Sequence, residues 1–327
     1  MSMADVAVWR RRARVADAAG LALGYLLDAA LGDPRRLHPV AGYGQLAAAL
    51  ERRTYAPTRK AGVRHVAVAV GVPVAGAAVL LGVTRRRPLT RIALMAAVTW
   101  TVLGGRSLRH EAEAMAGELQ SGDLSAARRR LPNLCGRDPS TLDESEIARA
   151  TVESVAENTS DAVVGPLVWG AVAGLPGLVG YRAVNTLDAM IGHRSSRYAA
   201  FGTAAARTDD VANVVPSRLT AALAVATAPL VSGSPARAAG VWFRDGNRHP
   251  SPNSGQAEAS FAGALGVRLG GRNVYAGRVE DRPTLGDGPR PSTEDIARAA
   301  KLSAAVGLGA LALCAGWTLA SAVRSRR

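Results

Sequence analysis

Apolar stretches alternate with short charged ones along the chain, and this pattern predicts membrane-spanning helices. Several stretches approach the roughly 20 residues that a helix needs to cross a bilayer. Longer polar segments, at residues 106–160 and 232–301, lie between them. We expect an all-α polytopic membrane bundle with re-entrant or broken helices and long polar loops, formed by a single domain over residues 1–327. The apolar segments lie near residues 18–31, 62–83, 92–105, 163–180, 216–231 and 302–323.

The first two hundred residues allow more specific expectations. Residues 18–31 follow an arginine-rich start, as in a signal peptide, but Asp28 argues against cleavage and favours a retained membrane element. Residues 62–83 and 92–105 flank the basic turn TRRRPLTR and predict a transmembrane helical hairpin. The segment 163–180 contains GLPG at residues 174–177, which favours a broken helix or re-entrant hairpin over a simple crossing.

The polar segments also predict helices. We expect one over Ser107–Gln120, a short basic one over Leu124–Leu131, and a third that ends near Asn158. Thr141 and Glu144 fit a capping box at the start of the third helix. Further along, Asn253 or Ser254 is placed to cap a short helix through Leu265, and the last helix begins after Ser292 or Thr293.

Composition narrows the class of partner. The net charge of +14 suits an anionic membrane surface or phosphorylated substrates. Nucleic acid is disfavoured, because the arginines are spread over every loop and aromatic residues for base stacking make up only 4%. Cys135 and Cys314 do not form a metal-spaced pair, so neither a zinc site nor a disulfide framework is indicated. The distribution of positive charge does not predict which ends of the helices face the cytoplasm, because arginine is dense in the segments at both ends of the apolar stretches.

Polar clusters flank the apolar segments and carry the candidate chemistry. They are Gly32–Val40 (GDPRRLHPV), Glu153–Asp161 (ESVAENTSD), Tyr181–Arg218 and His249–Glu258 (HPSPNSGQAE). The sequence contains no GxxxxGK[ST], GxGxxG, HExxH or GxSxG motif. Carboxylates with nearby amides suit Mg²⁺, which is usually coordinated by substrate phosphates together with one or two protein carboxylates. The cations expected to complement those phosphates are Arg182, Arg194, Arg207 and Arg218.

Simpler interpretations stay open beside these. The helix carrying Glu153, Glu157 and Asp161 at one-face spacing could be an ordinary solvated one. Asp209 and Asp210 could start a helix, with Asp209 as its cap. His38 and His249 each precede a proline and suit structural loop positions. Asp28 and Arg218 are harder to dismiss, because an ionisable group beside an apolar segment is costly unless it pairs or functions.

The same clusters resemble the CobD/CbiB family, the membrane-bound adenosylcobinamide-phosphate synthases of cobalamin biosynthesis. The resemblance runs from about Leu23 to Gly288, and its most specific motifs are ENTSD, NTLDAMIG and HPSPNSG. Small departures are Ala162, where the family commonly has glycine, and Gln256-Ala257, where it commonly has Trp-Pro. Neither removes a charged residue.

The resemblance implies amide formation between an amino-alcohol phosphate, such as (R)-1-amino-2-propanol O-phosphate, and a carboxylate of adenosylcobyric acid. ATP would drive the reaction with Mg²⁺ as cofactor. The implied partners are the corrinoid, the amino-alcohol phosphate, the nucleotide, the lipid bilayer and other cobalamin-assembly membrane enzymes. The implied location is the cytoplasmic membrane, in a multi-pass arrangement.

The resemblance also implies roles for the polar residues. Mg²⁺ ligands are expected at Asp161, Asp188 and Asp210, and a shared site for Asp161 and Asp188 requires residues 163–180 to turn back at GLPG. The candidate catalytic residues are Glu153, Asp161, Asp188, Asp209, Asp210 and His249. The candidate substrate-binding residues are Asp33, His38, Asn158, Arg182, Asn185, Asn213, Arg218, Asn253, Ser254 and Glu258.

Two other classes compete with the synthase. Distant AmpE-like relatives resemble signalling or sensory membrane proteins, although they are not expected to keep the full set of acids and asparagines. A transporter with intramembrane charges fits less well, because the polar clusters lie in loops and at helix ends and no inverted repeat is visible.

Overall fold

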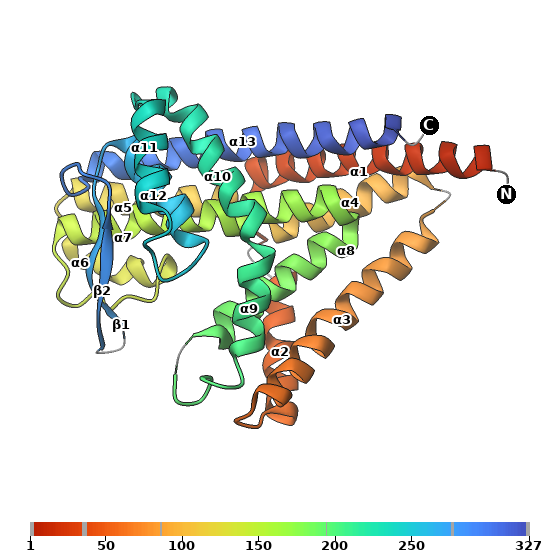
Figure 1. Cartoon of the computed structure of the whole chain (residues 1–327), viewed down its shortest axis with the longest axis horizontal. Coiled ribbons are helices and arrows are strands. Elements are labelled where there is room, and N and C mark those ends of the chain that lie inside the picture. The colour runs from red at the N-terminus through yellow and green to blue at the C-terminus, as the bar shows by residue number, and fades with distance from the viewer. Residues whose placement is uncertain (1–2, 35–37, 86, 194, 276–277, 325–327) are drawn as a thin grey trace. The chain divides into compact units, whose positions relative to one another are not determined.

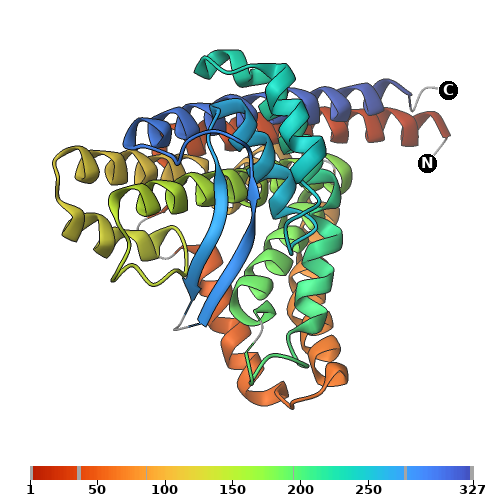
Figure 2. The same ribbon diagram turned by 60° about the vertical axis from the view of Figure 1, so that its left-hand side comes forward.

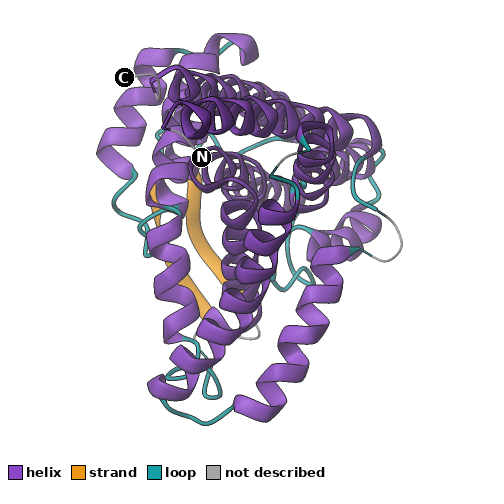
Figure 3. Ribbon diagram, turned by 90° about the vertical axis from the view of Figure 1, so that its right-hand side faces the viewer, coloured by secondary structure: helices purple, strands orange, loops and turns teal. Residues whose placement is uncertain are grey.

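A computed structural model describes residues 3–34, 38–85, 87–193, 195–275 and 278–324. Helices dominate the described chain, and the strands form one antiparallel pair (Figure 3). The predicted all-α fold class is therefore confirmed. In chain order the elements are α1 (Met3–Leu31), α2 (Pro39–Thr54), α3 (Arg59–Val83), α4 (Pro88–Val102), α5 (Gly105–Gln120), α6 (Leu124–Arg130), η1 (Leu131–Asn133), α7 (Glu144–Thr159), η2 (Ser160–Val164), α8 (Gly165–Leu187), η3 (Asp188–Gly192), α9 (Thr203–Ala212), α10 (Val214–Thr227), η4 (Ala228–Val231), α11 (Pro235–Asp245), α12 (Ser254–Leu265), β1 (Leu269–Tyr275), β2 (Arg278–Leu285) and α13 (Thr293–Arg324).

Five helical stretches within the described residues are long and apolar enough to cross a membrane, which makes this a multi-pass membrane protein. The predicted segment at residues 18–31 lies within α1 and is not among the five. The five are Arg59–Val83, Pro88–Gln120, Glu144–Gly192, Val214–Val231 and Thr293–Val323.

The chain divides into two compact units. The first unit contains residues 1–104, 165–213 and 311–327, and the second contains residues 105–164 and 214–310. Nothing in this division tests the prediction of one membrane-embedded domain.

In the first unit α1 runs along α4 (Figure 1). Gly20 and Gly24 permit the close approach, because a Cβ atom on Gly20 would lie 2.5 Å from Cβ of Met95, and one on Gly24 would press on Thr99. This GxxxG spacing is a familiar contact in membrane helices. The expected hairpin of α3 and α4 has its basic turn, but its arms diverge, and α3 packs on α8 instead (Figure 1). Arg86 of that turn lies outside the described residues.

The predicted break at GLPG is confirmed. Gly174 has φ 63° and ψ −145°, a conformation that side chains disfavour, so α8 consists of two helical halves. The halves fold back on each other. Gly165 faces the Tyr181 ring, and a Cβ on Gly170 would lie 3.1 Å from the Leu178 side chain. The chain between residues 165 and 187 is therefore a tight helical hairpin.

The second unit is built around α12, which packs against α11, α10 and α7 and is buried from Gly255 to Leu265. Two local predictions need correction here. The capping box of α7 is formed by Asp143 and Glu146 rather than by Thr141 and Glu144, so this helix begins two residues later than expected. Strands β1 and β2, which lie side by side in Figure 2, were not predicted within the polar segment at residues 232–301.

Replacing Gly174 by alanine tests the turn. A Cβ atom at this backbone conformation costs about 1–3 kcal/mol of stability, which should lower the thermal unfolding midpoint of the detergent-solubilised protein. Gly76→Ala in α3 is the matched control, because nothing lies within 4 Å of the added methyl group and the residue is helical. Equal midpoints for the two variants would contradict the turn.

Candidate functional site

A hydrogen-bonded network joins the second half of α8 to α9 in the first unit. Tyr181 Oη donates to Asn213 Oδ1 at 2.7 Å, and Asn213 Nδ2 donates to Asp209 Oδ2 at 2.9 Å. Asn185 Nδ2 approaches the other carboxylate oxygen of Asp209 at 3.4 Å. Each helix contributes two residues at i, i+4 spacing, which places them on one face. The structure thus brings the predicted Asn185, Asp209 and Asn213 together.

Arg182 connects this network to an apolar cavity. Its Nη1 lies 3.3 Å from Asn185 Oδ1 and donates to it. The same residue lines a cavity of about 210 Å³ with side chains from α2, α3 and α4, among them Tyr43, Pro73 and Val98. A cation at the edge of an apolar wall suits a ligand that is largely apolar but carries phosphate or carboxylate groups.

The predicted acids Asp188 and Asp210 also belong to the first unit. Asp188 begins η3, a π-helical turn, and its carboxylate lies so close to Gly192 that any side chain there would collide with it. Asp210 Oδ2 lies 3.9 Å from Arg207 Nη1. Both Asp209 and Asp210 fall near the end of α9, so the alternative in which Asp209 caps a helix start is wrong. Arg194 lies outside the described residues.

In the second unit the HPSPNSG loop meets α7 and α10. Ser254 Oγ donates to Glu157 Oε1 at 2.8 Å. Asn253 Oδ1 accepts from Ser217 Oγ at 3.2 Å and from Arg218 Nη1 at 3.0 Å. These contacts bring together the predicted Arg218, Asn253 and Ser254, and they give Arg218 a polar partner beside an apolar helix.

Glu258 is a buried acid close to other acids. Only 2% of it is exposed. Burial raises the pKa of Glu258 well above its ordinary value, repulsion from Glu153 and Glu157 adds to the rise, and attraction to Arg282 and Arg137 opposes it. A carboxyl group held in this way keeps its proton at pH values where an exposed glutamate has lost it.

His249 lies next to Glu258, with its Nε2 at 3.9 Å from Glu258 Oε1. Burial lowers the pKa of His249, and the charge of Arg282 lowers it further. The backbone N–H of Ser251 donates to His249 Nδ1 at 3.0 Å, which is a loop-stabilising contact. The ring is consequently neutral near pH 7 and has the protonation state of a base.

Glu153 is buried rather than solvated, with 4% of its surface exposed, so the solvated-face alternative is wrong for this residue. Its Oε2 pairs with Arg137, and its Oε1 accepts from the Gly270 N–H at 2.7 Å and lies 3.5 Å from Arg149. Both oxygens therefore have protein partners, and the Oε1 contact attaches β1 to α7. The α-helix ends at Thr159, so the expected one-face spacing does not extend to Asp161, which lies in the π-helical turn η2.

The remaining predicted residues make local contacts or are not part of the clusters described above. Asn158 Nδ2 donates to the Ser154 carbonyl at 2.9 Å. His38 caps α2, its Nδ1 accepting from the Val40 N–H at 3.2 Å, which supports the structural alternative. Asp33 is in the preceding loop, and residues 35–37 of that cluster lie outside the described residues. Asp161 belongs to the second unit and Asp188 to the first, so their shared site stays a prediction.

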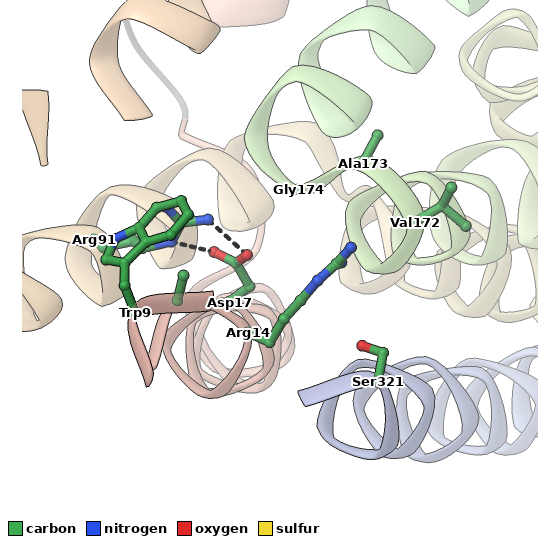
Figure 4. A pocket seen from close by; sticks show the side chains of 9 residues that line it. Trp9, Arg14, Asp17, Arg91, Val172, Ala173, Gly174 and Ser321 are labelled. Carbon is green, nitrogen blue, oxygen red and sulfur yellow. Dashed lines mark hydrogen bonds and ion pairs between the residues drawn. The ribbon is translucent and has the colours of Figure 1, made fainter. Parts of the chain in front are cut away.

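Sequence reasoning missed a charged group that braces the α8 turn (Figure 4). Arg91 donates to both carboxylate oxygens of Asp17, at 2.7 and 2.8 Å, and these side chains are only 10% and 4% exposed. Arg14 donates to the Ala171 carbonyl at 2.9 Å, just before Gly174. Together they line a cavity of about 420 Å³. An ionisable group beside an apolar segment is costly unless it pairs or functions. The same cost that singles out Asp28 would have identified Asp17 in the same way.

The sequence profile described as CobD/Cbib protein matches residues 21–303. The chain belongs to the CobD/Cbib protein family. It is 50% identical over 309 residues to the cobalamin biosynthesis protein CobD of Mycobacterium bovis, covering 94% of this chain and 96% of the relative. It is 47% identical over 272 residues to the protein of that name from Geobacter metallireducens, covering 81% and 85% respectively. No solved structure matches the chain.

Family membership covers both units, because the matched range includes the α8–α9 network and the HPSPNSG loop. Among the described residues of this CobD/Cbib protein, no group of three or more His, Cys, Asp or Glu side chains could hold a metal ion.

The buried pair of Asp17 and Arg91 should be strongly coupled. Arg91→Leu leaves an uncompensated carboxylate and should cost about 3–5 kcal/mol of stability, whereas the double change Asp17→Leu with Arg91→Leu should cost less. Thermal unfolding of the single and double variants in detergent measures the difference. A double variant that unfolds earlier than Arg91→Leu would contradict strong coupling.

Glu258 should make stability depend on pH. Because its pKa in the folded protein lies above its ordinary 4.5, the stabilisation is complete below 4.5 and is lost as pH rises through the raised value. Glu258→Gln has no proton to lose, so its advantage over the native protein should grow by about 1.4 kcal/mol per pH unit above 4.5 until the raised pKa is passed. Unfolding midpoints measured from pH 4 upward, with exposed Glu113→Gln as control, test this. Parallel curves for Glu258→Gln and the native protein would exclude it.

Proposed function

We propose that this CobD/Cbib protein is an ATP-dependent carbon–nitrogen ligase of the cytoplasmic membrane. It joins an amino-alcohol phosphate, such as (R)-1-amino-2-propanol O-phosphate, to a carboxylate of adenosylcobyric acid and gives adenosylcobinamide phosphate. The names of its relatives support the pathway, cobalamin biosynthesis. The reaction forms a C–N amide bond while ATP is converted to ADP and phosphate, and the carboxylate oxygen leaves in that phosphate.

The observation that carries the proposal is the placement of Arg182 between an apolar cavity and the Asn185–Asp209–Asn213 network. A corrinoid is a large apolar ring system edged with amide and carboxylate groups, and this wall offers both kinds of surface. The amides of Asn185 and Asn213 hold Asp209 in a fixed orientation. In this proposal Arg182, held at the edge of this network, orients the peripheral carboxylate for attack, which is the positioning that ligases rely on.

His249 fits the role of the base. The amine must lose a proton before it attacks, and a histidine whose lowered pKa keeps its ring unprotonated is in the form that can take one. Arg218 and Asn253, linked at 3.0 Å, present a guanidinium and an amide next to the same loop and suit the phosphate of the amino alcohol. Glu153 then serves the site indirectly, through its contacts with β1.

The donor set fits Mg²⁺ carried by phosphates. Asp188 and Asp210, both in the first unit, are the carboxylates proposed to meet it, since Mg²⁺ commonly takes one or two protein carboxylates. When bound, the ion neutralises charge on the transferring phosphoryl group. Gly192 leaves room for the Asp188 carboxylate, which is why a side chain at that position is not tolerated in this geometry.

Replacing Asp188 or Asp210 by alanine should abolish amide formation and leave membrane insertion intact. The assay follows adenosylcobinamide phosphate formed by purified protein from adenosylcobyric acid, the amino-alcohol phosphate and ATP with Mg²⁺. Glu113→Ala, on the exposed face of α5, is the control and should keep native turnover. Normal turnover in both aspartate variants would contradict the assignment. No product from the native protein would favour the AmpE-like signalling alternative.

A further inference from the structure

An arginine-lined pocket in the second unit is used neither by the predicted site nor by the network above. It has a volume of about 190 Å³ and is formed by α7, the start of β1 and the loop before α13. Its arginines come from distant parts of the sequence: Arg149, Arg268, Arg272 and Arg290. The one acid in its lining, Glu146, is engaged in the capping box of α7, where it accepts from the Asp143 N–H at 3.0 Å.

The floor of the pocket is a β-bulge held by side chains of α7. Gly270 and Gly271 have φ of 81° and 89°, and the register of β1 against β2 shifts between Leu269 and Gly271. This bulge re-aims the strand, as bulges do near functional sites. Arg149 donates to the Gly270 carbonyl and, at 3.0 Å, to that of Arg272, while Glu153 holds the Gly270 N–H.

The rim is formed by exposed cations. Arg268, Arg272 and Arg290 are exposed, and within the described part of the chain none of them forms an ion pair with a carboxylate. The Arg268 N–H donates to the Pro289 carbonyl at 2.9 Å, so the segments that carry Arg268 and Arg290 are joined. A Cβ atom on Gly271 would meet nothing within 4 Å, which leaves open space over the bulge.

We propose that this pocket binds the phosphate chain of a nucleoside triphosphate. Guanidinium groups match phosphate oxygens in geometry and charge. The pocket has more of these cations than one phosphate group needs, which favours a chain of phosphates. Pockets that enclose a whole drug-sized ligand are about 300–1,000 Å³, so this smaller one accommodates the phosphates and leaves the nucleoside outside. The nucleotide identity rests on the proposed ligase function, whereas the polyphosphate chemistry follows from the pocket alone.

Competition binding to the purified full-length protein in detergent tests the proposal. The probe is radiolabelled AMP-PNP with Mg²⁺, displaced by tripolyphosphate, orthophosphate or adenosine. We expect tripolyphosphate to displace it well, orthophosphate weakly and adenosine not at all. Displacement by orthophosphate as strong as by tripolyphosphate would show a single-phosphate site and overturn the proposal. So would the absence of binding of both AMP-PNP and tripolyphosphate to the native protein.

Arg268→Ala and Arg290→Ala should each weaken tripolyphosphate binding about tenfold, as expected for loss of a charge-assisted contact. Arg268→Lys should retain part of the affinity. Arg129→Ala, at an exposed position of α6 in the same unit, is the matched control and should bind normally. Native affinity in the Arg268→Ala, Arg290→Ala double variant would overturn the pocket.

The two proposals fail in different ways. Arginine-dependent tripolyphosphate binding without any amide synthesis would remove the ligase function and leave the pocket. Amide synthesis with an unchanged KM for ATP in the double variant would remove the pocket and leave the ligase.

Discussion

The hydrogen bond from Arg14 to the Ala171 carbonyl lies where α8 reverses, and it addresses the main cost of breaking a helix inside an apolar segment. Backbone groups released at such a break find no water in hydrocarbon and must be satisfied by protein. A cation at the end of a helical half also complements the negative end of its dipole. Asp17 and Arg91 lie beside this contact and neutralise each other, so the turn gains one cationic donor, Arg14, without a further unpaired charge.

The consequence of the reversal is the position of the α8–α9 network. Because Gly165 meets Tyr181 and Gly170 meets Leu178, the second half of α8 returns along the first. Tyr181, with 3% of its surface exposed, then directs its hydroxyl to Asn213 rather than to lipid. In a straight helix each residue lies about 1.5 Å further along the axis than the one before it. Arg182 and Asn185 would then lie far from Gly165 instead of returning toward it. The network therefore depends on small residues as much as on its polar ones.

Local signals predicted the helices but not every contact between them. The GLPG break, the starts of α12 and α13, and the basic turn before α4 could be identified because glycine, proline and polar helix-start residues act on their own backbone. The expected cap at Asn253 is wrong in its contact, since that side chain makes no capping hydrogen bond and accepts from Ser217 and Arg218. The packing of α4 on α1 depends on Gly20 and Gly24 meeting a distant helix, which single-sequence patterns do not specify. The β1–β2 pair was missed for a related reason. Its glycine bulge is held by Glu153 and Arg149, more than a hundred residues away.

The π-helical turns show why the site is harder to predict than the fold. Periodicity arguments assume 3.6 residues per turn, and on that basis Asp161 follows Glu153 and Glu157 along one face. The structure instead changes to π-helical geometry at Ser160, and again at Asp188 in the other unit. Single π-turns inserted in α-helices are frequent at functional sites, where the wider turn shifts the direction of a side chain. Both turns here contain an acid from the ENTSD or NTLDAMIG motif, so these motifs encode a departure from helical regularity as well as a chemical group.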